Sequence, residues 1–163
     1  MSNTNIEINI DEAKWLSELP EVEKIISKAC LATLVESGIL AHAKYLDVSM
    51  LLANDVKIQE LNGDYRNKGQ PTNVLSFPQE ILTAGDYEDV DVSISLGDIV
   101  LSLETIQKEA AEQKKTFEHH LVHLVVHGTL HLLGYDHEEA GDAHIMESLE
   151  VEILDEMGIN NPY

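Results

Sequence analysis

The chain has 163 residues with 30 Asp and Glu against 10 Lys and Arg, and this length predicts one domain spanning residues 1–163. The single cysteine, Cys30, excludes an internal disulfide framework and predicts a reducing compartment. No stretch approaches the roughly 20 apolar residues of a membrane-spanning helix, and residues 1–10 lack the basic flank and apolar block of a secretory signal. We therefore expect a cytoplasmic protein with no membrane association.

The first half of the chain is predicted to alternate strands and helices. Isoleucines at every second position predict a strand at residues 6–10. A helix is expected to begin near Pro20, where a proline loses no hydrogen bond, and to end before Gly38. A second strand is predicted at residues 45–52, followed by a short helix that Asn54 could cap.

The second half is predicted to contain two more strands and three helices. Prolines bracket a strand at residues 71–78, which favours an edge position, and an acidic loop follows at residues 85–91. A strand at residues 93–101 is interrupted or bulged at Gly97. Because the four strands do not alternate strictly with helices, the fold class is predicted to be α+β. The three helices are predicted at residues 103–114, 116–133 and 141–157.

The charge distribution separates two parts of the chain. A net charge of −20 argues against nucleic acid, because phosphate binding usually requires a basic patch. However, residues 136–156 hold nine acids and no Lys or Arg, whereas residues 66–80 hold Arg66, Lys68 and a single acid. Any anionic ligand is therefore expected at the second stretch. If Glu147, Glu150 and Glu152 of the last predicted helix are exposed, they would act only through the general field, which salt screens.

Histidines cluster at spacings that suit a metal ion. Six of the eight lie between residues 119 and 137. Residues four apart on a helix share a face, so His127 and His131 can direct two imidazoles at one ion, and Gly134 lets the chain turn back with His137 as a third ligand. Three protein ligands with a fourth position open to water are typical of catalytic zinc. The spacing predicts one zinc ion, although other divalent transition metals also accept imidazole.

Three short motifs resemble the YbeY family of bacterial endoribonucleases. Residues 127–137 read His-Gly-Thr-Leu-His-Leu-Leu-Gly-Tyr-Asp-His and match the family signature His-Gly-x-Leu-His-Leu-x-Gly-Tyr-Asp-His completely. Residues 65–78 follow the family's Tyr-Arg-x-Lys-Asp-x-Pro-Thr-(Asp/Asn)-Val-Leu-Ser-Phe-Pro, except that Gly69 replaces the common aspartate. Residues 96–99, Leu-Gly-Asp-Ile, resemble a third block.

The resemblance implies a zincin-like α+β fold with a mixed, roughly four-stranded sheet packed by helices. It also implies metal-dependent cleavage of single-stranded RNA, ribosomal RNA processing at the 3′ end of 16S RNA, and ribosome quality control. Ribosomal RNA, the ribosome and ribosome-associated proteins are the partners expected from it. It carries over His127, His131 and His137 as metal ligands, and Arg66 as an essential active-site residue.

The residues support a hydrolytic mechanism as a hypothesis. A metal-bound water, with its pKa lowered to about 7, would attack an RNA phosphodiester. Arg66, the only arginine of the chain, would stabilise charge on the phosphoryl oxygens, because a guanidinium binds them bidentately. Asp98 could orient the water or act as a base, but it could equally be a turn residue beside glycine. Lys68 and His123 are candidate substrate-binding residues, and His123 is also compatible with a partly buried helix face.

Two alternatives remain open from the residues. A zinc metallopeptidase of metzincin-like geometry would have the same histidine spacing, but such enzymes have a glutamate directly after the first histidine, where this chain has Gly128. A non-catalytic ribosome-assembly module with a structural metal is the other alternative. An open coordination position argues against it.

Overall fold

The computed structural model describes the backbone of residues 3–66 and 71–163, and the side chains of these residues except Tyr65 and Arg66. Its four strands are β1 (Asn3–Ile10), β2 (Tyr45–Ala53), β3 (Val74–Pro78) and β4 (Ser93–Ser102). They form one sheet in the order β1-β2-β4-β3. The first three strands in this order are parallel, and β3 pairs antiparallel with β4 at the edge. Proline cannot donate a hydrogen bond to a neighbouring strand. At the edge of the sheet this missing donor disrupts no pairing between inner strands.

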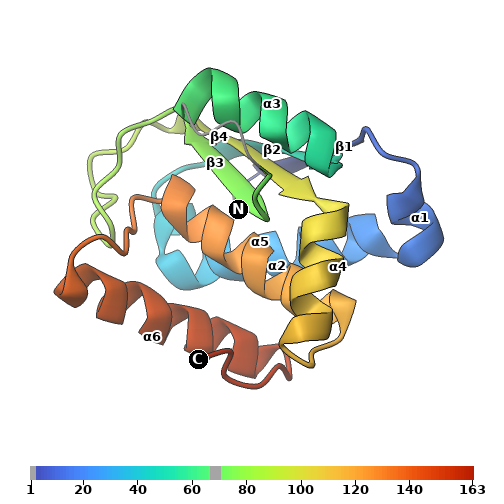
Figure 1. Cartoon of the computed structure of the whole chain (residues 1–163). Helices are drawn as coiled ribbons and strands as arrows, with labels where there is room; N and C mark the ends of the chain where they lie inside the picture. Colours follow the sequence, from blue (N-terminus) through green and yellow to red (C-terminus); the bar gives the residue numbers. More distant parts are fainter. Residues whose placement is uncertain (1–2, 67–70) are drawn as a thin grey trace.

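Helices cover both faces of the sheet (Figure 1). The helices are α1 (Lys14–Glu18), α2 (Val22–Ser37), α3 (Asp55–Arg66), α4 (Leu103–Glu112), α5 (Phe117–Leu132) and α6 (Ala140–Glu156), with a 3₁₀ turn, η1 (Ile39–Ala41). Figure 1 shows α3 on one face of the sheet, α2 and α5 on the other, and α6 outside these two. The sheet is thus buried between a single helix and a two-deep helical layer.

Alternation along the strands assigns side chains to one face or the other. On the α3 face, Leu75 and Val100 pack with Ile58 of α3. On the opposite face, Ser76 and Ile99 pair with each other and lie against α5. This assignment decides which strand residues can reach a site built on α5.

α5 is the central helix of the fold. It packs against α2, β3, α4 and α6, and most of its side chains are buried. A helix that is apolar almost all round must be enclosed on most sides, so its polar positions mark where the enclosure is open. The partly exposed positions in the middle and last turns are His123, His127 and His131.

The structure confirms the predicted α+β class and the mixed four-stranded sheet. Two local predictions are also confirmed: Asn54 caps α3 by accepting a hydrogen bond from the Lys57 amide at 2.9 Å, and Gly38 ends α2 in the left-handed region at φ 85°. β4 bulges next to Gly97, where its pairing with β2 shifts register. No helix among the described residues has the length and apolarity to span a bilayer.

Candidate metal centre

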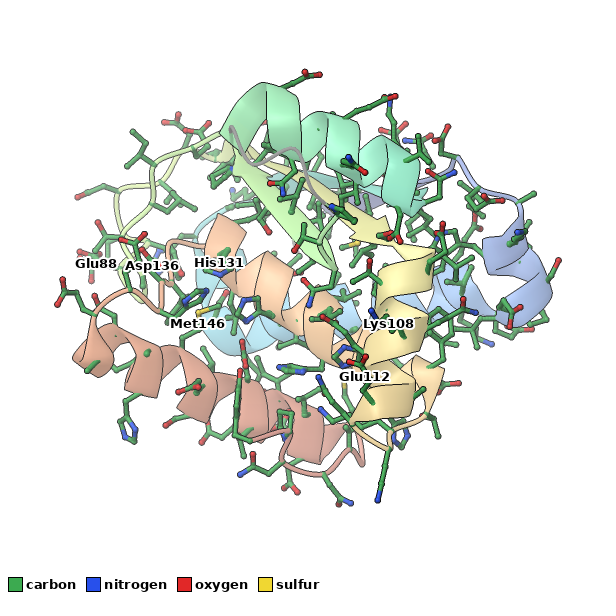
Figure 2. The ribbon with its side chains drawn as sticks, viewed as in Figure 1. Glu88, Lys108, Glu112, His131, Asp136 and Met146 are labelled. Atoms are coloured by element: carbon green, nitrogen blue, oxygen red, sulfur yellow. The ribbon has the colours of Figure 1, made fainter. Side chains whose placement is uncertain are left out.

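The site is built on the open face of α5. Thr116 caps the helix by accepting a hydrogen bond from the His119 amide at 3.1 Å. One turn separates His123, His127 and His131, so their side chains follow one another along the same face. Figure 2 shows His131 near the C-terminal end of α5, on the side of the segment that carries Asp136.

A glycine turn returns the chain to the helix. Gly134 has φ 99°, a conformation that other residues rarely adopt, and a Cβ there would lie 2.4 Å from the carbonyl oxygen of Leu82. Immediately afterwards, the Asp136 side chain accepts a hydrogen bond from the His137 amide at 2.7 Å. This tight turn brings the third histidine back to the face of α5.

The structure brings together the three histidines predicted as ligands. One nitrogen from each of His127, His131 and His137 lies within 4.8 Å of the others. The Nε2 atoms of His127 and His131 are 3.1 Å apart. Two nitrogens bound to one zinc at about 2.0–2.1 Å with tetrahedral angles are about 3.3 Å apart, so the spacing fits a single ion.

The hydrogen bonds of the other ring nitrogens provide a chemical test of this fit. Nδ1 of His127 faces the Glu150 carboxylate at 2.5 Å, and Nδ1 of His131 faces the Tyr135 carbonyl oxygen at 3.0 Å. Both partners only accept, so each Nδ1 carries the proton and a neutral ring then has a bare Nε2. Two bare nitrogens that face each other repel unless a cation lies between them. The residues therefore fit a metal ion.

The surroundings of His131 favour the neutral ring that a metal requires. Burial lowers its pKa to about 4, and the neighbouring His127 and His137 act in the same direction. At neutral pH this imidazole is uncharged, with a lone pair available.

The buried acid Glu150 was not identified as a site residue from the sequence. Its side chain is 0% exposed on α6 and accepts from Nδ1 of His127 and, at 3.2 Å, from Nε2 of His123. The Tyr163 hydroxyl donates to it as well. Burial alone would raise the pKa of Glu150, but the hydrogen bonds from His123, His127 and Tyr163 lower it to about 2. The sequence groups Glu150 with Glu147 and Glu152 as acids acting through the general field if exposed, and Glu150 does not meet that condition because it is buried.

The histidines open into a cavity of about 790 Å³. It extends from His123, His127 and His131 along β3 to Pro71 and Asn62 of α3. Other lining residues are Thr72, Asn73, Ser76, Asp136, His137 and Tyr163. The cavity thus joins the histidine cluster to the strand bracketed by prolines.

The other predicted site residues fall in different places. His123 lines the cavity and contacts Glu150, 3.2 Å away. Asp98 is exposed on β4 and pairs with Phe77 on the α3 face, so the structure does not bring it to the histidines. Arg66 is the last residue of α3, but its side chain lies outside the described residues, as does Lys68 entirely.

Gly128 separates this site from that of a metallopeptidase. A Cβ at this position would lie 3.2 Å from Ser76 Oγ and 3.3 Å from side-chain atoms of Ile99 and Val74. The Gly128 carbonyl also accepts a hydrogen bond from Ser76 at 3.1 Å. The position that carries the glutamate base in peptidases is here packed closely against the sheet.

Comparison with known proteins agrees with this geometry. The family model described as Endoribonuclease YbeY matches residues 6–158. A protein named Endoribonuclease YbeY from Bartonella bacilliformis is 43% identical, over 98% of this chain and 96% of its own. The protein of that name from Bradyrhizobium diazoefficiens is 42% identical, over 100% of this chain and 88% of its own.

A solved structure has the same fold. The solution structure of TM1509 from Thermotoga maritima superposes with a TM-score of 0.53 at 25% identity, covering 94% of this chain and 91% of that one. A match along nearly the whole sequence, at about 40% identity and with the histidine cluster assembled, establishes the relationship. The chain belongs to the Endoribonuclease YbeY family.

Proposed function

We propose that this protein is a zinc-dependent endoribonuclease that cleaves single-stranded RNA during ribosomal RNA processing. The observation that carries the proposal is the pair of Nε2 atoms, 3.1 Å apart, at the wall of a cavity of about 790 Å³. Membership of the Endoribonuclease YbeY family supplies the reaction class. We also propose that the protein is cytoplasmic and acts in maturation of the 16S RNA 3′ end and in ribosome quality control.

The chain's own residues prepare the site for hydrolysis. His127, His131 and His137 would hold the ion, and Glu150 and the Tyr135 carbonyl keep the ring protons of the first two on Nδ1. When bound, an ion on three imidazoles would lower the pKa of water to about 7 and so make hydrolysis possible at neutral pH. The cavity beside the rings leaves space for a phosphodiester.

The place of Arg66 at the end of α3 is compatible with a contact to the phosphate of a bound RNA. It follows Asn62 of α3 by one helical turn, and Asn62 lines the cavity. Pro71, the first described residue after the gap, lines it too. We assign to Arg66 the stabilisation of charge on the phosphoryl oxygens, and to Lys68 a contact with the RNA backbone.

The alternatives have less support. A peptidase needs a general base next to the first histidine, and Gly128 has neither a carboxylate nor space for one. A purely structural metal would normally have four protein ligands, whereas three residues form the cluster found among the described residues.

A direct test compares two substrates with and without chelator. The full chain is incubated with single-stranded RNA and, separately, with casein, and His137→Ala serves as the variant with one ligand removed. We expect RNA cleavage that chelator abolishes and zinc restores, intact casein, and parallel loss of zinc and cleavage in His137→Ala. Chelator-sensitive casein cleavage without RNA cleavage would reverse the assignment.

A further inference from the structure

Glu150 is a buried charge in an unusual setting. It is 0% exposed, and within the described part of the chain its ion-pair partners are two histidines. One oxygen faces His127, while the other faces His123 and the Tyr163 hydroxyl. A carboxylate removed from water is costly unless hydrogen bonds and a compensating positive charge surround it. The hydrogen bonds are present, but no Lys or Arg among the described residues forms an ion pair with Glu150.

The direction of the His127 hydrogen bond indicates where the positive charge that compensates Glu150 would lie. His127 presents Nδ1 to Glu150 and Nε2 to the metal centre, so its ring connects the carboxylate directly to the position of the ion. An ion on Nε2 withdraws electrons from the ring and strengthens the Nδ1 hydrogen bond. The carboxylate in turn makes the ring a better donor to the metal.

We propose that Glu150 is the positioning residue of the metal centre. It fixes the tautomer and the orientation of His127 and offsets part of the charge of the ion, while Tyr163 and His123 hold its second oxygen so that the carboxylate cannot rotate away. The proposal rests on the metal site of the proposed function. It adds α6 and the segment after it to a centre whose ligands come from α5 and the turn that follows.

The geometry around the second oxygen supports this assignment. The rings of Tyr163 and His123 meet edge to face at a centroid distance of 5.6 Å, and Tyr163 lines the same cavity as the ligands. The His123 side chain is 12% exposed, and its remaining nitrogen, Nδ1, is buried without a hydrogen-bond partner among the described residues. His123 therefore has one strong partner, Glu150.

The alternative is that Glu150 only joins two packed helices. Then Glu150→Gln, which keeps the shape of the side chain, would lower the stability of the metal-free protein and leave its zinc affinity unchanged once folded. If Glu150 positions His127, zinc affinity falls even where the metal-free protein remains folded. Zinc affinity and metal-free stability therefore separate the two roles, and neither measurement depends on RNA cleavage.

The experiment measures the zinc dissociation constant of the full chain by competition with a chromogenic chelator, next to urea unfolding of the metal-free protein. Glu150→Gln is expected to weaken zinc binding about 10–100-fold, the range for partners of metal-binding histidines. Glu152→Gln removes the same charge from an exposed position on the same helix and is expected to stay within about twofold. Tyr163→Phe, at a half-exposed position, is expected to weaken zinc binding less than Glu150→Gln but beyond the control.

The outcomes separate the inference from the function on which it rests. If the wild-type chain does not bind one zinc ion, the metal site and the role of Glu150 both fail. If the wild type binds zinc and Glu150→Gln binds it equally well, only the role of Glu150 is overturned. If Glu150→Gln does not fold, Tyr163→Phe decides, and an affinity equal to that of Glu152→Gln would overturn the proposal.

Discussion

Whether an imidazole can bind a metal depends on which of its nitrogens carries the proton, and acceptors of two kinds determine this here. The Glu150 carboxylate holds the proton of His127 on Nδ1, and the Tyr135 carbonyl does the same for His131. The carbonyl is fixed by the backbone of the glycine turn, whereas the carboxylate depends on the packing of α6 on α5. The two proposed ligands are thus oriented by different parts of the fold.

The three histidines could be predicted from the sequence, but Glu150 could not. A four-residue spacing and a glycine are local features, so the helix period alone places His127 and His131 on one face. On α6, Glu147, Glu150 and Glu152 look alike in sequence. Which of them is buried depends on how α6 crosses α5, and that is a tertiary property. In the structure Met146 is buried and Leu149 packs against the core, and Glu150 lies beside them on α6.

Arg66→Ala should separate phosphate stabilisation from metal binding. If Arg66 stabilises phosphoryl charge and does not bind the ion, the variant keeps the fold and one zinc ion and loses about 10²–10³-fold in cleavage rate. Arg66→Lys should recover only part of this rate, because an ammonium keeps the charge but cannot form paired hydrogen bonds. The measurement is single-turnover cleavage at saturating RNA, together with zinc content.

Lys57→Ala, which removes a positive charge near the start of the same helix, is the control and should cleave at the wild-type rate. Near-normal cleavage by Arg66→Ala under these conditions would make Arg66 an ordinary surface charge.

At the scale of elements, β3 is attached to the helices by a polar network that the sequence did not reveal. Asn73, next to the strand, donates to Glu109 of α4 at 2.9 Å, and Glu109 also pairs with Nε2 of His120 at the same distance. Burial lowers the pKa of His120, although Glu109 opposes this. The network fixes the start of β3 beside the cavity. Its members are 47 residues apart in sequence from Asn73 to His120, so no local pattern could show it.

Helices with clear end signals were predicted well, whereas the short helix α1 was missed. Helix α2 ends at Gly38 and α3 begins after Asn54, as the capping residues indicated. The five-residue helix α1 has no side-chain cap. It is held by tertiary contacts: the Trp15 indole donates to the Ala53 carbonyl at 2.8 Å, and its ring lies 5.7 Å from that of Phe117.

Gly134→Ala should disturb the turn that brings His137 to the site. A Cβ would lie 2.4 Å from the Leu82 carbonyl oxygen, and φ is 99°, so both the backbone and its neighbour would have to move. We expect the free energy of unfolding to fall by about 1–3 kcal/mol and zinc affinity to fall with it. The measurements are urea unfolding of the metal-free protein and zinc competition.

Gly141→Ala is the matched control. It lies in α6 with nothing within 4 Å of the added methyl group, so alanine should be neutral or stabilising there. Equal stability and zinc affinity for the two variants would show that the turn tolerates a side chain and does not define the site.

At the scale of the whole molecule, the net charge of −20 has to be reconciled with an RNA substrate. Acids gather on α2 and α6: the Glu36 carboxylate of α2, with Glu152 and Asp155 of α6, raises the pKa of Glu156. The cavity instead opens between α5, β3 and α3, the helix that ends at Arg66. The uneven distribution should direct a polyanion to the cavity and away from α6.

Measurements of RNA affinity at several salt concentrations should show whether RNA binds at the cavity or across α6. Each phosphate neutralised on a single strand contributes about −0.7 to the slope of log affinity against log salt. If Lys68 contacts one phosphate, Lys68→Ala should weaken binding and make the slope shallower by about that amount. The double variant Glu147→Gln, Glu152→Gln should change affinity only slightly, in the tightening direction, and this effect should vanish at high salt because it acts through the screened field.

Photocrosslinking on the inactive His137→Ala protein provides the independent check, and crosslinks concentrated in residues 145–157 would mean that RNA approaches across α6 in spite of its charge.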